Sequence, residues 1–293
     1  MKKFKKIITL STMICTFIIG GIFIQVNKVQ ASQISSTSNG ILSDPIILSR
    51  FPQLKNEQSK VKNLMNSKEI YVNIQNPDSK KPIIKTYNTE QYINIKKQQN
   101  NKYLLNNKSV SVSVPKQNSW IRITLSVYST SSSTYKIYGY YTWLTSPIRH
   151  GNDVISLSHD SHMTFIYSSA WGQNVWSEGG FGTPISYKEN RTSLYSSSSN
   201  FTGQIGGIAF KFPLGSGVGI NSSGTSVYPY GFICVNAMKG NSGDSSAELG
   251  LTYAHSQASI AISPSISIPL GTSISVSPAL NYDKFNLPYT VRY

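Results

Sequence analysis

Three of the four histidines in this chain of 293 residues fall close together, with two aspartates among them. They are His150, His159 and His162, and the aspartates are Asp153 and Asp160. Imidazole and carboxylate groups at short spacing are ligands that zinc and similar ions accept. However, residues 159–162 stand between two apolar runs where a hairpin turn is needed, and strand residues three apart point to opposite faces. We therefore predict turn residues here, with no metal and no other cofactor.

The stretch from Gly240 to Asp244, Gly-Asn-Ser-Gly-Asp, suggests a second chemistry, acyl transfer from a serine nucleophile. It resembles the nucleophile loop of chymotrypsin-like secreted proteases, in which backbone amides beside the serine form an oxyanion hole. The resemblance implies Ser242 as nucleophile, with a histidine of residues 150–162 as its base. It ends after four residues, and Gly, Asn and Ser also form ordinary β-turns. The prediction is a turn, no catalytic residue and no enzyme, with a secreted serine protease as an alternative.

Aromatic side chains beside polar groups give a third candidate, a ligand-binding surface. Three tyrosines share one face of a predicted hairpin with a basic residue on each strand, and two tryptophans fall in a Gly-rich, loop-like stretch. Such rings offer large contact area to sugars or peptides for little loss of entropy. The alternative is that a two-sheet fold uses them as core and edge cover. The candidate ligand-binding residues are Tyr128, Tyr138, Tyr140, Trp171 and Trp176.

The hairpin that carries the tyrosines is predicted over residues 120–143. Apolar residues alternate with polar and aromatic residues on both halves, and a Ser/Thr-rich stretch separates them. One face stays apolar only if Val127 pairs with Ile137 and Leu125 with Gly139, because a slip of one residue inverts every side chain. The turn must therefore hold an odd number of residues, about seven.

Residues 260–280 show the most regular alternation in the chain. Even positions are mostly Ile, Leu, Val and Pro, whereas odd positions are mostly Ser, with Ala, Gly and Pro. This is the period of a β-hairpin with one apolar face, and a turn is expected at residues 269–272. Further strands are predicted at 154–157, 163–167, 205–212, 230–235 and 247–253. Short strands with Gly, Ser and Pro turns predict an all-β fold, an antiparallel β-sandwich of Greek-key or similar type.

The first residues predict export. Four lysines precede the apolar stretch 7–26, and the sequence Val29-Gln30-Ala31 fits a signal peptidase site. We therefore predict a signal peptide over residues 1–31, cleavage after Ala31, and a secreted or cell-wall-associated protein. The alternative is an uncleaved membrane anchor. The sequence has a net charge of +15, and without residues 1–31 it keeps a charge of +10 and one cysteine, Cys234.

Composition divides the rest into two regions. Residues 32–108 are rich in Asn, Gln, Lys and Ser and carry 12 basic and 5 acidic residues, whereas residues 109–293 carry 10 basic and 7 acidic residues. We predict that residues 32–108 form a basic, flexible N-terminal region or pro-segment and that residues 109–293 form the all-β domain.

These patterns predict a secreted, non-enzymatic β-domain protein that mediates an interaction at or outside the cell envelope. The expected partner is a cell-wall polymer, a glycan or a protein, with weak contact to a membrane surface through the basic region and no nucleic acid. The alternative is a membrane-active, pore-forming protein, because residues 260–276 resemble the inserting hairpins of aerolysin-like toxins. Pro264 interrupts that candidate after about six residues, fewer than the 9–11 that span a bilayer.

Overall fold

The computed structural model describes residues 40–77, 79, 82–105, 118–147, 149–178, 186–193, 200–215, 219–220, 226–257, 265–277 and 282–293. They all belong to one compact unit, Ser35–Tyr293. The predicted signal peptide and its cleavage site at Ala31 lie outside the described residues. No helix within the described ranges is long and apolar enough to cross a membrane.

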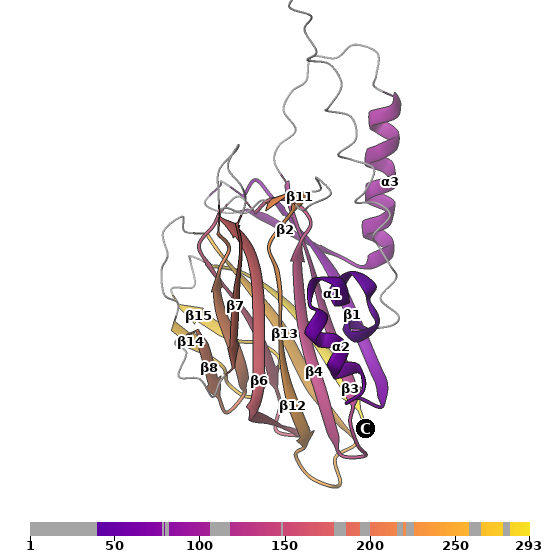
Figure 1. Cartoon of the computed structure of the whole chain (residues 1–293), viewed down its shortest axis with the longest axis vertical. Helices are drawn as coiled ribbons and strands as arrows, with labels where there is room; N and C mark the ends of the chain where they lie inside the picture. Colours follow the sequence, from indigo (N-terminus) through magenta and orange to yellow (C-terminus); the bar gives the residue numbers. More distant parts are fainter. Residues whose placement is uncertain are drawn as a thin grey trace, which may run out of the picture. The chain divides into compact units, whose positions relative to one another are not determined.

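Two antiparallel sheets packed together form the fold, as the alternating sequence predicts (Figure 1). The larger, sheet A, has the strand order β2-β1-β3-β4-β12-β6-β7. Its strands are β1 (Asn63–Gln75), β2 (Ile83–Tyr87), β3 (Asn118–Ser129), β4 (Thr134–Trp143), β6 (Met163–Glu178), β7 (Ser186–Ser193) and β12 (Tyr230–Lys239).

Sheet B has the strand order β16-β13-β5-β9-β8. Its strands are β5 (Asn152–His159), β8 (Phe201–Gln204), β9 (Gly207–Pro213), β13 (Ser246–Ser256) and β16 (Tyr282–Arg292). Two short hairpins lie outside the sheets, β10 (Gly219–Ile220) with β11 (Ser226–Val227), and β14 (Ser265–Ser267) with β15 (Ser275–Ser277).

The predicted register of the β3–β4 hairpin is confirmed. Val127 pairs with Ile137, and Leu125 pairs with Gly139. The odd-numbered residues of β3 therefore enter the core between the sheets. A Cβ atom added at Gly139 would lie 2.5 Å from Leu251 Cδ1, so the two sheets approach closely there. The last pair of the hairpin is Ser129 with Tyr135, so five residues lie between the paired positions, an odd number as predicted but fewer than the predicted seven.

Described parts of the N-terminal region pack on the sandwich. β1 pairs with β3 along its length, and Val72 and Ile74 are buried in the core between the sheets. Residues 40–58, called here the N-terminal segment, form η3 (Ile41–Ser43), α1 (Pro45–Arg50), η4 (Pro52–Leu54) and α2 (Lys55–Gln58). The few apolar side chains of these residues are buried against sheet A. The division into an N-terminal region and an all-β domain stays a prediction. The boundary predicted at residue 108 lies outside the described residues.

A longer helix, α3 (Thr89–Leu105), follows β2. Its first half packs on sheet A, because the Tyr92 ring stacks on Tyr71 at 4.1 Å and meets Trp120 edge-on at 5.1 Å. The contact joins the polar N-terminal region to the sandwich a second time.

The β14–β15 hairpin covers part of the outer face of sheet B. Ile268, Ile274 and Val276 are buried, and they pack in one cluster with sheet residues that include Ala209 and Ala254. Ser267 and Ser275 are exposed. The predicted alternation is therefore present in residues 265–268 and 273–276, whereas Leu270, between the two strands, is 46% exposed. The buried face rests on the outside of sheet B and not in the core between the sheets. Pro264 lies outside the described residues.

Candidate functional site

The outer face of sheet A carries the aromatic residues singled out from the sequence. Tyr128, Tyr138 and Tyr140 lie there on β3 and β4, and Trp171 lies beside them on β6. Trp176 occupies the alternate face of β6, because residues 171–178 pair continuously with β7 and strand side chains alternate. The stretch predicted as a loop is thus a strand, which separates the two tryptophans. We call this surface the aromatic face; its rings are Tyr128, Tyr138, Tyr140, Trp171, Tyr230 and Phe232.

The aromatic face is covered by the N-terminal segment. All three predicted tyrosines are at most 3% exposed, because the segment's apolar side chains pack on them. While the segment is in place, these three side chains are therefore not exposed to an outside ligand. Ligand binding by these residues stays a prediction, and it now requires that the segment leaves.

Local sequence signals begin the segment's helix. Asp44 is the N-cap of α1, where its Oδ1 accepts hydrogen bonds from the amides of Ile46 (2.8 Å) and Ile47 (3.3 Å). Pro45 occupies the first helical turn, where it loses no hydrogen bond. Just before, Gly40 has a φ of 72°, and a Cβ atom there would lie 2.4 Å from the Tyr128 hydroxyl oxygen. Only glycine fits this close approach to the sheet.

Side chains of β3 bind the backbone at the start of the segment. The Ile41 amide donates to Ser126 Oγ at 3.1 Å, and the Leu42 amide donates to the Tyr128 hydroxyl at 2.8 Å. No residue of the segment forms a strand, so the sheet holds it through side chains rather than by ladder pairing. This is how a surface recognises a peptide laid across it.

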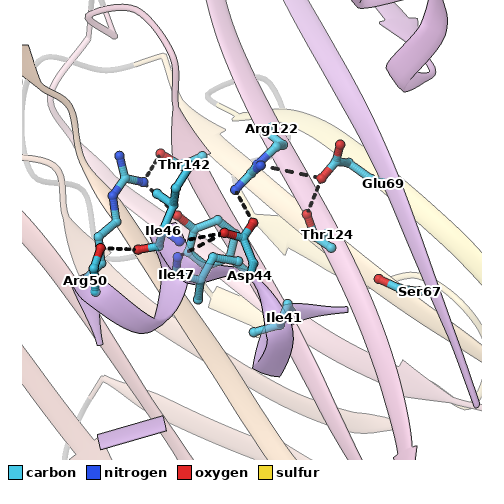
Figure 2. Close-up of polar contacts among 12 residues, drawn as sticks. Ile41, Asp44, Ile46, Ile47, Arg50, Ser67, Glu69, Arg122, Thr124 and Thr142 are labelled. Carbon is cyan, nitrogen blue, oxygen red and sulfur yellow. Dashed lines mark hydrogen bonds and ion pairs between the residues drawn. The ribbon is translucent and has the colours of Figure 1, made fainter. Parts of the chain in front are cut away.

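A buried ionic centre lies beneath α1 (Figure 2). The Arg122 guanidinium, from β3, lies 3.6 Å from the Asp44 carboxylate of the segment and 3.7 Å from the Glu69 carboxylate of β1. All three groups are less than 10% exposed. Glu69 also accepts a hydrogen bond from Thr124 at 3.1 Å. The sheet therefore supplies the buried cation, Arg122, and one carboxylate, Glu69. The segment supplies the second carboxylate, Asp44.

Phe51 is the central apolar anchor of the segment. It is fully buried, and its ring meets Phe232 edge-on at 4.7 Å and Tyr230 at 5.3 Å. Beside it, Arg50 donates to the Tyr140 hydroxyl at 2.8 Å and to Thr142 Oγ1 at 2.9 Å, as Figure 2 shows for the Thr142 contact. Aromatic packing and a charge-assisted contact thus meet in one pocket on β4 and β12.

The end of the segment is held by a second ion pair. The Glu57 carboxylate receives a hydrogen bond from the Lys136 ammonium of β4 and another from Lys60 at 2.9 Å. Burial alone would raise the pKa of Glu57, but these two cations lower it below its usual range. Both acidic residues of the segment therefore lie on cations of the sheet.

Cys234 lies within the covered face. It is fully buried in the same cluster, and this burial raises the pKa of its thiol to about 12. As predicted, it packs as a small apolar residue. Its position makes the thiol sensitive to whether the segment is in place.

Sequence reasoning named four residues of this face, with Trp176 on the other side of β6, and missed the segment that covers it. Asp44, Arg50, Phe51 and Glu57 stand in the stretch predicted to be flexible. The signal that could have found them is Asp44 followed by proline and an apolar pair, a helix start in which the acid caps the first turn. Nothing local indicates that the helix lies on a strand more than 80 residues away.

The histidines and Ser242 do not form an active site in the described residues. The turn that holds Ser242 lies against the turn that holds His162, whose carbonyl accepts a hydrogen bond from the Gly240 amide at 2.8 Å. His162 contacts the Asp160 carboxylate at 3.0 Å, yet Ser242 makes no hydrogen bond to any described residue. His159 points inward onto Phe165, and burial lowers its pKa. Residues 161–162 and 242–243 form turns as predicted, whereas His159 is the buried last residue of β5.

Asp153 lies apart from that turn in a buried polar cluster. Its carboxylate accepts the Tyr253 hydroxyl at 2.5 Å and the Ser256 amide at 2.9 Å, and it lies 3.0 Å from His255 Nδ1. Burial and the charge of His255 lower the pKa of nearby His150. Within the described ranges, no group of three His, Cys, Asp or Glu side chains is arranged to hold a metal ion.

Neither a protein-family model nor a curated protein matches the sequence. Among solved structures, the collagen-binding subdomain of the Enterococcus faecalis surface protein ACE is similar with a TM-score of 0.30 and 8% identity, over 56% of this chain and 90% of that one. The collagen-binding domain of a Staphylococcus aureus adhesin is similar with a TM-score of 0.28 and 12% identity, over 55% of this chain and 89% of that one. The Clostridium perfringens NetB toxin in its membrane-inserted form is similar with a TM-score of 0.22 and 10% identity, over 64% of this chain and 95% of that one. Similarity this low assigns neither a family nor a ligand.

Proposed function

We propose that this chain is a secreted, non-enzymatic β-sandwich protein that binds a protein ligand at or outside the cell envelope through the aromatic face of sheet A. One observation carries the proposal: the face already holds a non-strand peptide, its own N-terminal segment, through side-chain contacts. The secretory pattern of residues 1–31 supports the location. A protein ligand is favoured over a glycan or a wall polymer because the groups on the face bind backbone amides, carboxylates and a phenyl ring of the segment.

The membrane-active alternative depended on residues 260–276 as an inserting hairpin. In the described part of this stretch, the strands of the hairpin span three residues each, and their apolar side chains are buried on sheet B. These contacts favour a structural role for the hairpin.

The function is tested by selecting ligands for the mature chain. A Phe51→Ala variant, in which the segment is loosened, is presented with a displayed peptide library, purified cell walls, glycans and lipid vesicles. We expect saturable binding of peptides. Lys136→Gln on the aromatic face should weaken this binding, whereas Lys284→Gln on the exposed side of β16 should leave it unchanged.

Two results would reject the proposal. One is saturable binding to walls, glycans or vesicles alone. The other is peptide binding that is equally strong in the Lys136→Gln and Lys284→Gln proteins, because the ligand would then lie on another surface.

A further inference from the structure

The arrangement of charges on the aromatic face is more specific than a general peptide-binding surface. Arg122 on β3 pairs across to Thr142 on β4, and Lys136 stands six residues before Thr142 on the same strand. The Cα atoms of Arg122 and Lys136 are therefore about 20 Å apart, at roughly 3.3 Å per strand residue. Their charged groups lie closer together, over the rings of Tyr140 and Tyr138, which are two residues apart on β4. Asp44 lies on the first cation and Glu57 on the second. The pocket for Phe51, formed by rings of β4 and β12, receives the part of the segment between these two acids.

The segment is attached to the sandwich through a short exposed connection. Residues 59, 60 and 62 are exposed, and β1 begins at Asn63. Within residues 40–58, the helices contact each other and the sheet, so the segment is a self-contained unit laid on the face. A short tether of this kind gives its peptide an effective concentration in the millimolar range. A separate ligand must therefore bind tightly enough to compete with this effective concentration, or bind when the segment is loosened.

We propose that the N-terminal segment is a displaceable self-ligand, and that the protein ligand of this face is a peptide with one carboxylate for Arg122, one for Lys136 and an aromatic anchor between them. This inference rests on the proposed function and adds the ligand's chemistry and its regulation. The two carboxylates take the places of Asp44 and Glu57, and the aromatic ring takes the place of Phe51. Arg122 is the more selective of the two cations, because its planar guanidinium is already oriented by Glu69.

The test uses a labelled peptide with the sequence of residues 40–58 and the mature protein carrying Phe51→Ala. Fluorescence anisotropy should show saturable binding to this protein. Binding to the wild type should be at least tenfold weaker, because the tethered segment competes. A matched peptide with Asp44→Asn and Glu57→Gln should bind at least tenfold more weakly. Asparagine caps a helix as well as aspartate does, so this comparison reports charge rather than helix formation.

Cys234 gives a second readout in the same samples, since it is the only cysteine after residue 31. A thiol reagent should modify it at least tenfold faster in the Phe51→Ala protein than in the wild type, and the native peptide should slow the reaction again by covering the face. Near-ultraviolet circular dichroism checks the fold. If Phe51→Ala unfolds the sandwich, Arg50→Gln is used, which removes the contacts to Tyr140 and Thr142 but keeps the apolar packing.

Two outcomes would overturn the inference. Unchanged Cys234 reactivity in both loosened proteins would show that the segment does not leave. Fast modification with equal affinity for the native and neutralised peptides would show that the acidic pattern is not recognised. Either result differs from failure of the proposed function, which is judged by the ligands selected and by their response to Lys136→Gln.

Discussion

Replacing Arg122 by methionine is expected to lower the free energy of unfolding by about 3–5 kcal/mol. The change removes the only cation near the buried carboxylates of Asp44 and Glu69 among the described residues. Removing one partner of a buried ion pair leaves uncompensated charge in a medium that solvates it poorly. Urea denaturation followed by tryptophan fluorescence measures the loss.

The matched control is Arg292→Met, because Arg292 is exposed near the end of β16. It should change stability by less than about 0.5 kcal/mol. Equal, small effects of both substitutions would mean that the ionic centre beneath α1 does not contribute to the folded state.

The second large effect is expected from Ile274→Asp in the β14–β15 hairpin. Ile274 is 3% exposed and packs on the outer face of sheet B. Aspartate there would lose the apolar contact and bury a carboxylate with no partner, which should cost at least about 3 kcal/mol. The thermal midpoint and the urea midpoint of the mature protein measure the change.

Ser275→Asp is the control for the hairpin, because the neighbouring side chain points to solvent. It should be nearly neutral. A stable, well-folded Ile274→Asp protein that had lost leakage activity on lipid vesicles would instead support the membrane-active alternative, since its side chain would then meet an apolar phase only after insertion.

Strand alternation was sufficient to predict much of the sandwich. The β3–β4 register follows from one requirement, an apolar inner face, and the structure has that register. β16 was missed, and β6 was predicted only over residues 163–167, both for physical reasons. β16 contains Pro288 and several charged residues, which an edge strand tolerates. β6 contains Gly172, and glycine in a sequence usually indicates a loop. Here the strand requires glycine, because a Cβ atom would lie 2.9 Å from the Phe232 carbonyl oxygen.

The site was predicted only in part because its two halves depend on different kinds of information. The alternation of β3 and β4 places Tyr128, Tyr138 and Tyr140 on one face, and this was read correctly. That face is covered through long-range contacts such as the hydrogen bond from Leu42 to Tyr128, which lie 86 residues apart. No local pattern encodes such a contact, and the polar composition of residues 32–108 concealed the few apolar side chains that make it.

The central claim, that the aromatic face binds its N-terminal segment as a ligand, is tested most directly by cutting the tether. A site-specific protease sequence is inserted between Ser59 and Lys60, and the cleaved protein is compared with the uncut one. We predict that the sandwich keeps its near-ultraviolet spectrum and that the fragment dissociates on dilution with a measurable Kd. Cys234 should become reactive in proportion to the fragment released. Cooperative unfolding of the sandwich after cleavage would contradict the claim, because the segment would then be an integral layer of the fold.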